Sequence, residues 1–174
     1  MFGLFKAKPE THYCRLDDLV WQTAPVRQQQ LLARARQLAL DGTHTMLCSH
    51  SLITLGNLRQ VLGKDSEQLC LADAARVSAA SLLQWLAPAK PLRLMVAEFG
   101  ATAADDEQLL QRINDPRLKN LTVEFHVSLD DAALKSIVSP QLRQILQQLG
   151  LKPDEPIQHR YVTRAIANAR SKKP

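Results

Sequence analysis

Apolar and polar positions along the chain form two alternating patterns. Short apolar runs are separated by longer stretches in which apolar residues recur every three or four positions. Short runs are typical of buried strands, and the longer pattern is typical of amphipathic helices. The predicted strands cover residues 19–23, 45–48, 68–72, 91–99 and 121–127. Residues 121–127 alternate more clearly than the others, which predicts a place nearer to an edge of the sheet.

The helical stretches lie between these predicted strands, at residues 26–40, 52–62, 77–86 and 105–113. Pro25 precedes the first helix, and Gly63 follows the second, as expected for a helix start and a helix end. Strands that alternate with helices of this length require right-handed crossovers and favour parallel pairing. We therefore predict an α/β fold with a mostly parallel sheet of about five strands flanked by helices.

From Ser128 onward the pattern is helical only, with predicted helices at residues 128–138, 140–150 and 162–173. Ser128 is placed to cap the first of them, and Asp131 stands three positions later, where a capping box usually has Glu. We predict a tail at residues 1–12 and an α/β domain at 13–127. Residues 128–174 are predicted to form a helical C-terminal extension packed on the same domain.

The last third of the chain carries a series of residues at fixed spacing. A strand ends in FHVSLDD, a later helix ends in LG, and a turn has Glu155, Ile157 and His159 at alternating positions before VTRAI. This series resembles the second helicase lobe of SecA, the bacterial preprotein-translocase motor. The matching residues are Ser128, Leu129, Asp131, Leu149, Gly150, Glu155, Ile157, His159, Val162, Thr163, Ala165, Ile166 and Ala169. Residues 19–58 resemble the start of that lobe more weakly.

The resemblance implies a RecA-like lobe, but the residues with which SecA handles ATP have no counterpart here. The family's first lobe carries a G-x-x-x-x-G-K-[ST] phosphate loop, and its second lobe carries arginines in glycine-supported loops that reach the γ-phosphate. The 174 residues contain no such phosphate loop, and Arg112 and Arg117 fall on a predicted helix and after a proline. Arginine fingers need a rigid loop to hold the cation at the developing phosphoryl charge. We therefore predict a degenerate, stand-alone copy that lacks the ATPase motifs, is not an enzyme and uses no cofactor.

Four polar residues are predicted to lie at the carboxyl ends of the strands, where ligands bind to open parallel sheets. They are Ser49, His50, Asp73 and Glu98. One interpretation is a small acid/base or nucleotide-contact site at this rim. The other is that the serines and Asp73 cap helices while His50 is exposed. The second interpretation is favoured, because no motif supplies a nucleophile, a base and a group to orient the base.

No metal site is predicted. His44, Cys48 and His50 would share one face of a single strand. Zinc sites normally draw ligands from at least two segments in paired spacings, which this chain lacks. The three cysteines are far apart and fit a reducing compartment.

The formal net charge of +5 raises the possibility of an acidic partner or a nucleic acid. Four cations, Arg164, Arg170, Lys172 and Lys173, gather near the C-terminus, where they also complement the helix dipole. Acidic patches elsewhere weaken the nucleic-acid hypothesis. No export leader and no apolar run long enough to span a bilayer is recognised, so a cytoplasmic protein is expected.

Three functional hypotheses follow. The first is a non-catalytic, SecA-like helicase-lobe domain that acts through protein–protein contact, with a protein partner or with itself, and with a possible link to protein export. The second is a small-molecule or nucleotide-binding protein that uses the sheet rim. The third is nucleic-acid binding through the basic C-terminal helix. We favour the first. A nucleotide is not expected because the rim is acidic, and a nucleic acid is not expected because acidic patches lie elsewhere on the chain.

Overall fold

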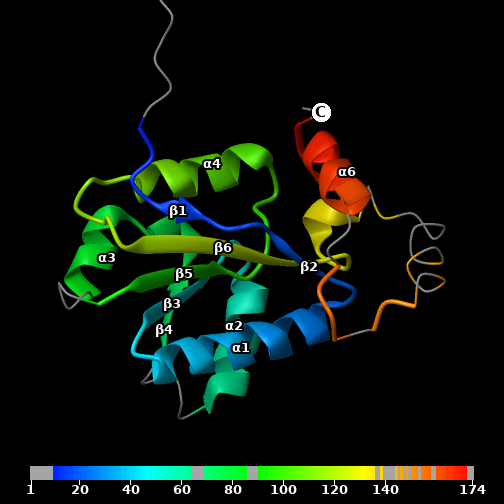
Figure 1. Ribbon diagram of the computed structural model, residues 1–174, viewed down its shortest axis with the longest axis horizontal. Helices are drawn as coiled ribbons and strands as arrows, with labels where there is room; N and C mark the ends of the chain where they lie inside the picture. Colours follow the sequence, from blue (N-terminus) through cyan, green and yellow to red (C-terminus); the bar gives the residue numbers. More distant parts are fainter. Residues whose placement is uncertain are drawn as a thin grey trace, which may run out of the picture.

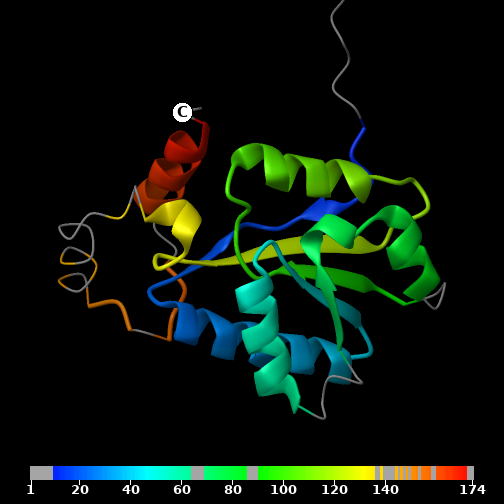
Figure 2. The same cartoon turned by 180° about the vertical axis from the view of Figure 1, so that it is seen from behind.

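The structure is a computed structural model in which a parallel sheet carries helices on both faces (Figure 1, Figure 2). It describes residues 10–63, 69–85, 90–135 and 160–171, and between them 138, 144, 146, 148, 150–152 and 154–157. The predicted α/β class is confirmed, and the arrangement is consistent with a RecA-like lobe. None of the helices in these residues is long and apolar enough to cross a membrane.

Every strand pairing among the described residues is parallel. The spatial order is β1-β6-β5-β3-β4, and β2 also pairs with β6. The strands are β1 (Cys14–Arg15), β2 (Leu19–Trp21), β3 (His44–Ser49), β4 (Cys70–Asp73), β5 (Leu92–Val96) and β6 (Leu121–Ser128). Since all of them run the same way, their carboxyl ends meet at one edge of the sheet, which we call the rim.

Capping side chains mark the starts of α1 and α2, although α1 begins two residues before the predicted start and includes Pro25 in its first turn. The side chains of Thr23 and Ser51 accept the N–H groups of Val26 and Thr54, which satisfies donors that the helix itself cannot pair. The helices are α1 (Ala24–Leu40), α2 (Leu52–Leu62), α3 (Ala79–Trp85), α4 (Ala103–Arg112) and α6 (Arg160–Ser171), with 3-10 turns η2 (Ala74–Arg76) and η3 (Ala132–Leu134).

Successive residues of the central strands enter two separate cores, as the pleat of a strand requires. Leu47 and Met95 pack with buried leucines of α1 and α2 on one face. Met46 and Leu94 face the opposite way and join buried residues of α3 and α4. The second core extends into the C-terminal residues through Ile157, Val162 and Ile166.

The prediction that residues 121–127 lie nearer to a sheet edge is wrong. β6 is an internal strand, with β5 on one side and β1 and β2 following one another along it. Its polar Glu124 and His126 are 1% and 0% exposed. The alternation that suggested a solvated face reflects a buried polar cluster instead. The two-residue strand β1 was not predicted, because two residues carry no periodic signal.

The predicted helix at 128–138 starts later than expected. Ser128 is the last residue of β6, and the first helical turn after β6 in the described residues is η3 at Ala132–Leu134. The predicted Ser128–Asp131 pairing does form, since the Asp131 carboxylate accepts the backbone N–H of Ser128 at 2.7 Å. The predicted tail, residues 1–12, falls mostly outside the described residues, as do Leu149 and His159.

Candidate functional site

Glu98 collects hydrogen bonds from the start of α2 at the middle of the rim. Its Oε1 accepts the Ser49 hydroxyl at 2.6 Å and the Ser51 backbone N–H at 2.8 Å. Its Oε2 accepts the Thr54 hydroxyl at 3.1 Å. Ser49 is 1% exposed and Glu98 is 9% exposed. The predicted meeting of Ser49 and Glu98 is therefore present, but their polar atoms are directed at each other and at α2.

Arg27 of α1 brings a buried cation to the same place. Its guanidinium pairs with Asp131, and its Nη1 lies 4.0 Å from Glu98 Oε2. Arg27 is 4% exposed and Asp131 is 6% exposed. Burial raises the pKa of Asp131 to about 6, although Arg27 and the Ser128 N–H act in the opposite direction. One buried guanidinium thus serves two carboxylates from different strand ends.

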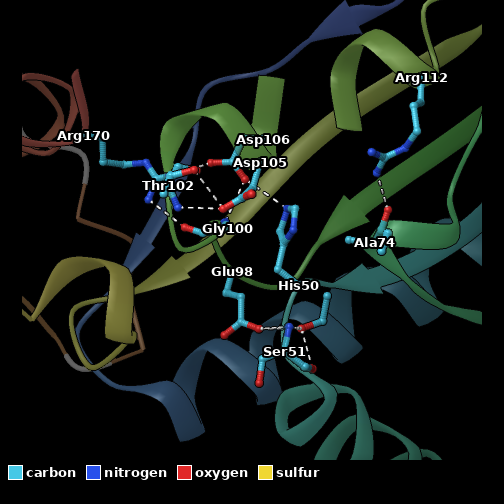
Figure 3. A network of polar contacts seen from close by, with 12 residues as sticks. His50, Ser51, Ala74, Glu98, Gly100, Thr102, Asp105, Asp106, Arg112 and Arg170 are labelled. Atoms are coloured by element: carbon cyan, nitrogen blue, oxygen red, sulfur yellow. Dashed lines mark hydrogen bonds and ion pairs between the residues drawn. The ribbon is translucent and has the colours of Figure 1, made fainter. Parts of the chain in front are cut away.

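His50 takes part in a second network, on the α4 side of the rim (Figure 3). Its Nε2 lies 3.1 Å from Asp106 Oδ1. This contact lacks hydrogen-bond geometry, so its effect is electrostatic and depends on protonation of the ring. The His50 side chain is 14% exposed, which corrects the interpretation of an exposed histidine.

Asp106 also anchors the C-terminal helix. Its Oδ1 accepts the Gly100 N–H at 2.8 Å, and its Oδ2 pairs with Arg170 of α6. The same guanidinium donates to the carbonyls of Gly100 and Thr102 at 3.1 and 2.9 Å and lies 4.3 Å above the centre of the Phe99 ring. The guanidinium of Arg170 therefore makes intramolecular contacts and is not free to bind a nucleic acid. Lys172 and Lys173, the last two of the predicted basic cluster, lie outside the described residues.

Asp73 does not join the other rim candidates. It caps η2, with its Oδ1 accepting the Ala75 N–H at 2.9 Å. Its other neighbours include Arg59 and Arg76, around a hollow beside β4. The capping interpretation was correct for Asp73, as it was for Ser51.

A separate buried polar cluster lies within β6, away from the rim candidates. Arg34 of α1 binds Glu124 through two hydrogen bonds of 2.7 and 3.0 Å, and Arg93 and His126 approach the same carboxylate at 3.4 and 3.0 Å. Burial alone raises the pKa of Glu124, but these hydrogen bonds outweigh it and hold the pKa at about 2. Burial lowers the pKa of His126. We assign a neutral His126 that donates its Nε2 proton to a charged Glu124.

The sequence did not assign Arg27 or Arg170 to the rim, although it placed Arg170 in the C-terminal basic cluster. Each lies in an ordinary amphipathic helix, and each is 64 or more residues from its carboxylate partner along the chain. Charged positions on helices are usually solvated, so nothing local marks these two as buried. A polar residue on the apolar stripe of α1, beside Leu31, was the available signal.

The rim as a whole offers little to an external ligand. Ser49 is buried, and the carboxylates of Glu98, Asp106 and Asp131 accept backbone N–H groups and bind the chain's own arginines. A phosphate entering here would meet three acidic side chains, and such charges repel it strongly where water is excluded. Among the described residues, no group of three or more His, Cys, Asp or Glu side chains is arranged to hold a metal ion.

Comparison with known proteins identifies SecA as a relative of part of the chain. The protein translocase subunit SecA of Syntrophobacter fumaroxidans is 44% identical over 48 residues, which are 28% of this chain and 6% of that protein. SecA of Legionella pneumophila, strains Corby and Philadelphia 1, is 34% identical over 84 residues, 47% of this chain and 9% of that protein. No family model matches. The chain therefore contains a SecA-like region, and the match spans less than a tenth of the length of these relatives.

Proposed function

We propose that this chain is a non-catalytic, SecA-like domain that works through contact with another protein, in a process linked to protein translocation. The observation that carries the proposal is the state of the rim. Where an open parallel sheet would receive a ligand, this chain has placed Glu98, Asp106 and Asp131 in contact with its own Arg27 and Arg170. The similarity to SecA supports the link to translocation.

Electrostatics supports the non-catalytic part of this proposal. Catalysis of phosphoryl transfer depends on cations that are free to approach the γ-phosphate. Among the described residues, Arg27 and Arg170 are the arginines paired with Asp131 and Asp106 of the rim, so both guanidiniums are already bound to buried carboxylates. Turning either of them toward a nucleotide would leave a carboxylate buried without a partner, which costs several kcal/mol. A stable protein–protein surface makes no such demand on the rim.

A thermal-shift experiment tests the non-catalytic part. ATP, ADP and GTP are added at millimolar concentration, each with and without magnesium, and the midpoint of unfolding is compared with that in sodium triphosphate. A ligand that binds only the folded state must raise the midpoint. We expect no nucleotide-specific rise and no release of phosphate from ATP. A magnesium-dependent rise with ATP, together with phosphate release, would overturn the proposal.

Sedimentation velocity tests the protein-contact part. The chain is run alone and with purified SecA from the same organism. We expect either a concentration-dependent self-assembly or a complex that sediments faster than both components. A chain that stays monomeric and does not alter the sedimentation of SecA would contradict the proposed contact.

A further inference from the structure

The sheet ends on one side at β4, which pairs only with β3 among the described strands. All four residues of β4 are partly exposed. An edge strand leaves a row of backbone N–H and C=O groups without partners, and proteins usually cover or block such an edge. The 3-10 turn η2 follows directly after the last residue of β4 and does not pair with its outer edge. Among the described residues no strand pairs with the outer edge of β4, and we take this edge as the place where another extended segment can pair.

A groove runs beside this edge, between β4 and α2. It has a volume of about 370 Å³, and we call it the β4-edge groove. Its lining includes Leu52, Leu55, Arg59, Leu71, Asp73 and Arg76. Leu52, which belongs to this lining, is 71% exposed, and its neighbour Ile53 at the start of α2 is 78% exposed. Exposed apolar side chains beside an open strand edge are typical of a protein-binding surface.

The charges of the groove favour an acidic occupant. Arg59 and Arg76 are both exposed, and within the described part of the chain neither forms an ion pair or a side-chain hydrogen bond. Asp73, the acidic residue of the lining, is engaged in capping η2. A second copy of this chain is disfavoured as the occupant, because a symmetric contact would bring the same arginines together on molecules of net charge +5.

From these observations we propose that the β4-edge groove binds an extended segment of a partner protein whose groove-facing side carries both apolar and acidic residues. The segment adds a strand beside β4. On the side that faces the groove, an apolar side chain covers Leu52, and carboxylates two residues away pair with Arg59 and Arg76. Main-chain pairing supplies affinity in this mode, and the alternate side chains supply specificity. The inference rests on the proposed function in protein contact, and it identifies the surface and the chemistry of the partner.

Fluorescence anisotropy with two labelled peptides tests this inference. In the first peptide pairs of valines alternate with pairs of glutamates, so that each side of the strand carries both residue types, and in the second lysine replaces each glutamate. We expect the full chain to bind the glutamate peptide and to prefer it over the lysine peptide. The double variant Arg59→Glu, Arg76→Glu is expected to lose about tenfold or more in affinity for the glutamate peptide. It is also expected to gain affinity for the lysine peptide.

A matched control is the double variant Lys119→Glu, Arg164→Glu, which changes the net charge equally at exposed positions outside the groove. It should bind the glutamate peptide within about twofold of the unaltered chain, apart from long-range attraction that salt screens. Equal losses in the two double variants, or binding of neither peptide, would overturn the inference. A complex with SecA, or self-assembly, that persists while neither peptide binds would reject the groove and leave the proposed protein contact standing.

Discussion

Arg27 is a charged residue near the start of a surface helix, yet its side chain is 5% exposed and lies between two acidic residues. Replacing it by methionine keeps most of the volume but leaves Asp131 and Glu98 buried without a cation. Breaking a buried pair from one side costs about 3–5 kcal/mol. We predict that Arg27→Met lowers the free energy of unfolding by about that amount, measured by urea denaturation at neutral pH.

Arg117 provides the matched control. It pairs with Asp115 at 2.7 Å, but its side chain is 68% exposed. Water screens such a pair and can replace either partner, so Arg117→Met should leave the urea midpoint almost unchanged. If both variants shifted the midpoint equally, burial of the Arg27 ion pair would not explain its contribution to the free energy of unfolding.

His126 gives a prediction about pH. Its ring is fully buried, stacks on Trp21 at 6.1 Å between ring centres, and faces Glu124 with Arg34 and Arg27 nearby. Burial lowers its pKa below the usual 6.5. Below pH 6.5 the unfolded chain therefore takes up a proton at this residue that the folded chain refuses. Stability must fall as the pH drops through this window, by up to about 1.4 kcal/mol per pH unit for one proton.

The measurement is the free energy of unfolding at intervals from pH 7.5 to pH 5, compared with His126→Gln. Asp131 acts in the opposite direction, since its raised pKa of about 6 makes the folded state the better proton binder below that pH. The difference in slope between the two proteins removes this contribution and that of the other histidines. We expect a shallower fall in the variant. Identical slopes would show that His126 titrates normally.

The sequence predicted the residues of the rim more successfully than their partners. Ser49, His50 and Glu98 follow from their place at strand ends, a local property of the chain. Arg27 and Asp131 are 104 residues apart, so their pairing depends on how α1 docks beside β6. His126 and Glu124 show the same limit. The alternating pattern shows that these positions are polar, but it does not show whether water or an arginine provides their hydrogen bonds.

At the scale of elements, the side chain of Arg170 ties α6 to the rim. Arg170 contacts Gly100 and Thr102, which lie just before α4, and Asp106, which lies in its first turn. We predict that Arg170→Ala frees the end of α6 while leaving the sheet intact. Loss of these charge-assisted bonds corresponds to about 1.5–3 kcal/mol at most, so amides of α6 should exchange with deuterium about tenfold faster or more.

Arg164→Ala tests whether this effect is specific. Arg164 lies on the same helix but is exposed, so its removal changes helix propensity and charge without breaking a contact to the rim. Hydrogen exchange of α6 should remain near that of the unaltered chain. Equal acceleration in both variants would mean that α6 is held by its apolar face alone.

Capping residues mark several element boundaries, and only the start of α2 was predicted to the residue, since α1 and α4 begin two residues earlier than predicted. Thr23, Ser51 and Thr102 stand at the starts of α1, α2 and α4, and Gly63 ends α2 with a positive φ of 51°. The end of β6 was not predicted, because Ser128 fits two patterns. It fits the pattern of a helix cap, and it also forms the last strand pairing, with Trp21. Pairing with β2 extends the strand and delays the first helical turn to η3.

At the scale of the whole molecule, the C-terminal residues share a core with the sheet. Ile157, Val162 and Ile166 belong to the same buried cluster as Val20 and Phe125. The Ile157 N–H also donates to the Val20 carbonyl at 2.7 Å. Burying three such side chains stabilises the fold by roughly 1.5–3 kcal/mol each. The boundary between residues 13–127 and 128–174 thus separates two kinds of secondary structure. We predict that the two parts unfold together as one cooperative unit.

Urea unfolding followed by two signals tests this prediction. Tryptophan fluorescence reports mainly on Trp21, which is 5% exposed beside β6, and on Trp85 at the end of α3. Far-ultraviolet circular dichroism reports on all helices, α6 included. A single cooperative unit must give coincident transitions, because α6 cannot leave the shared core without exposing the side chains that Val20 packs against. An early loss of helix signal before the fluorescence change would show instead that the extension unfolds separately. The SecA-like resemblance of the last third would then describe a segment that the sheet binds but does not need.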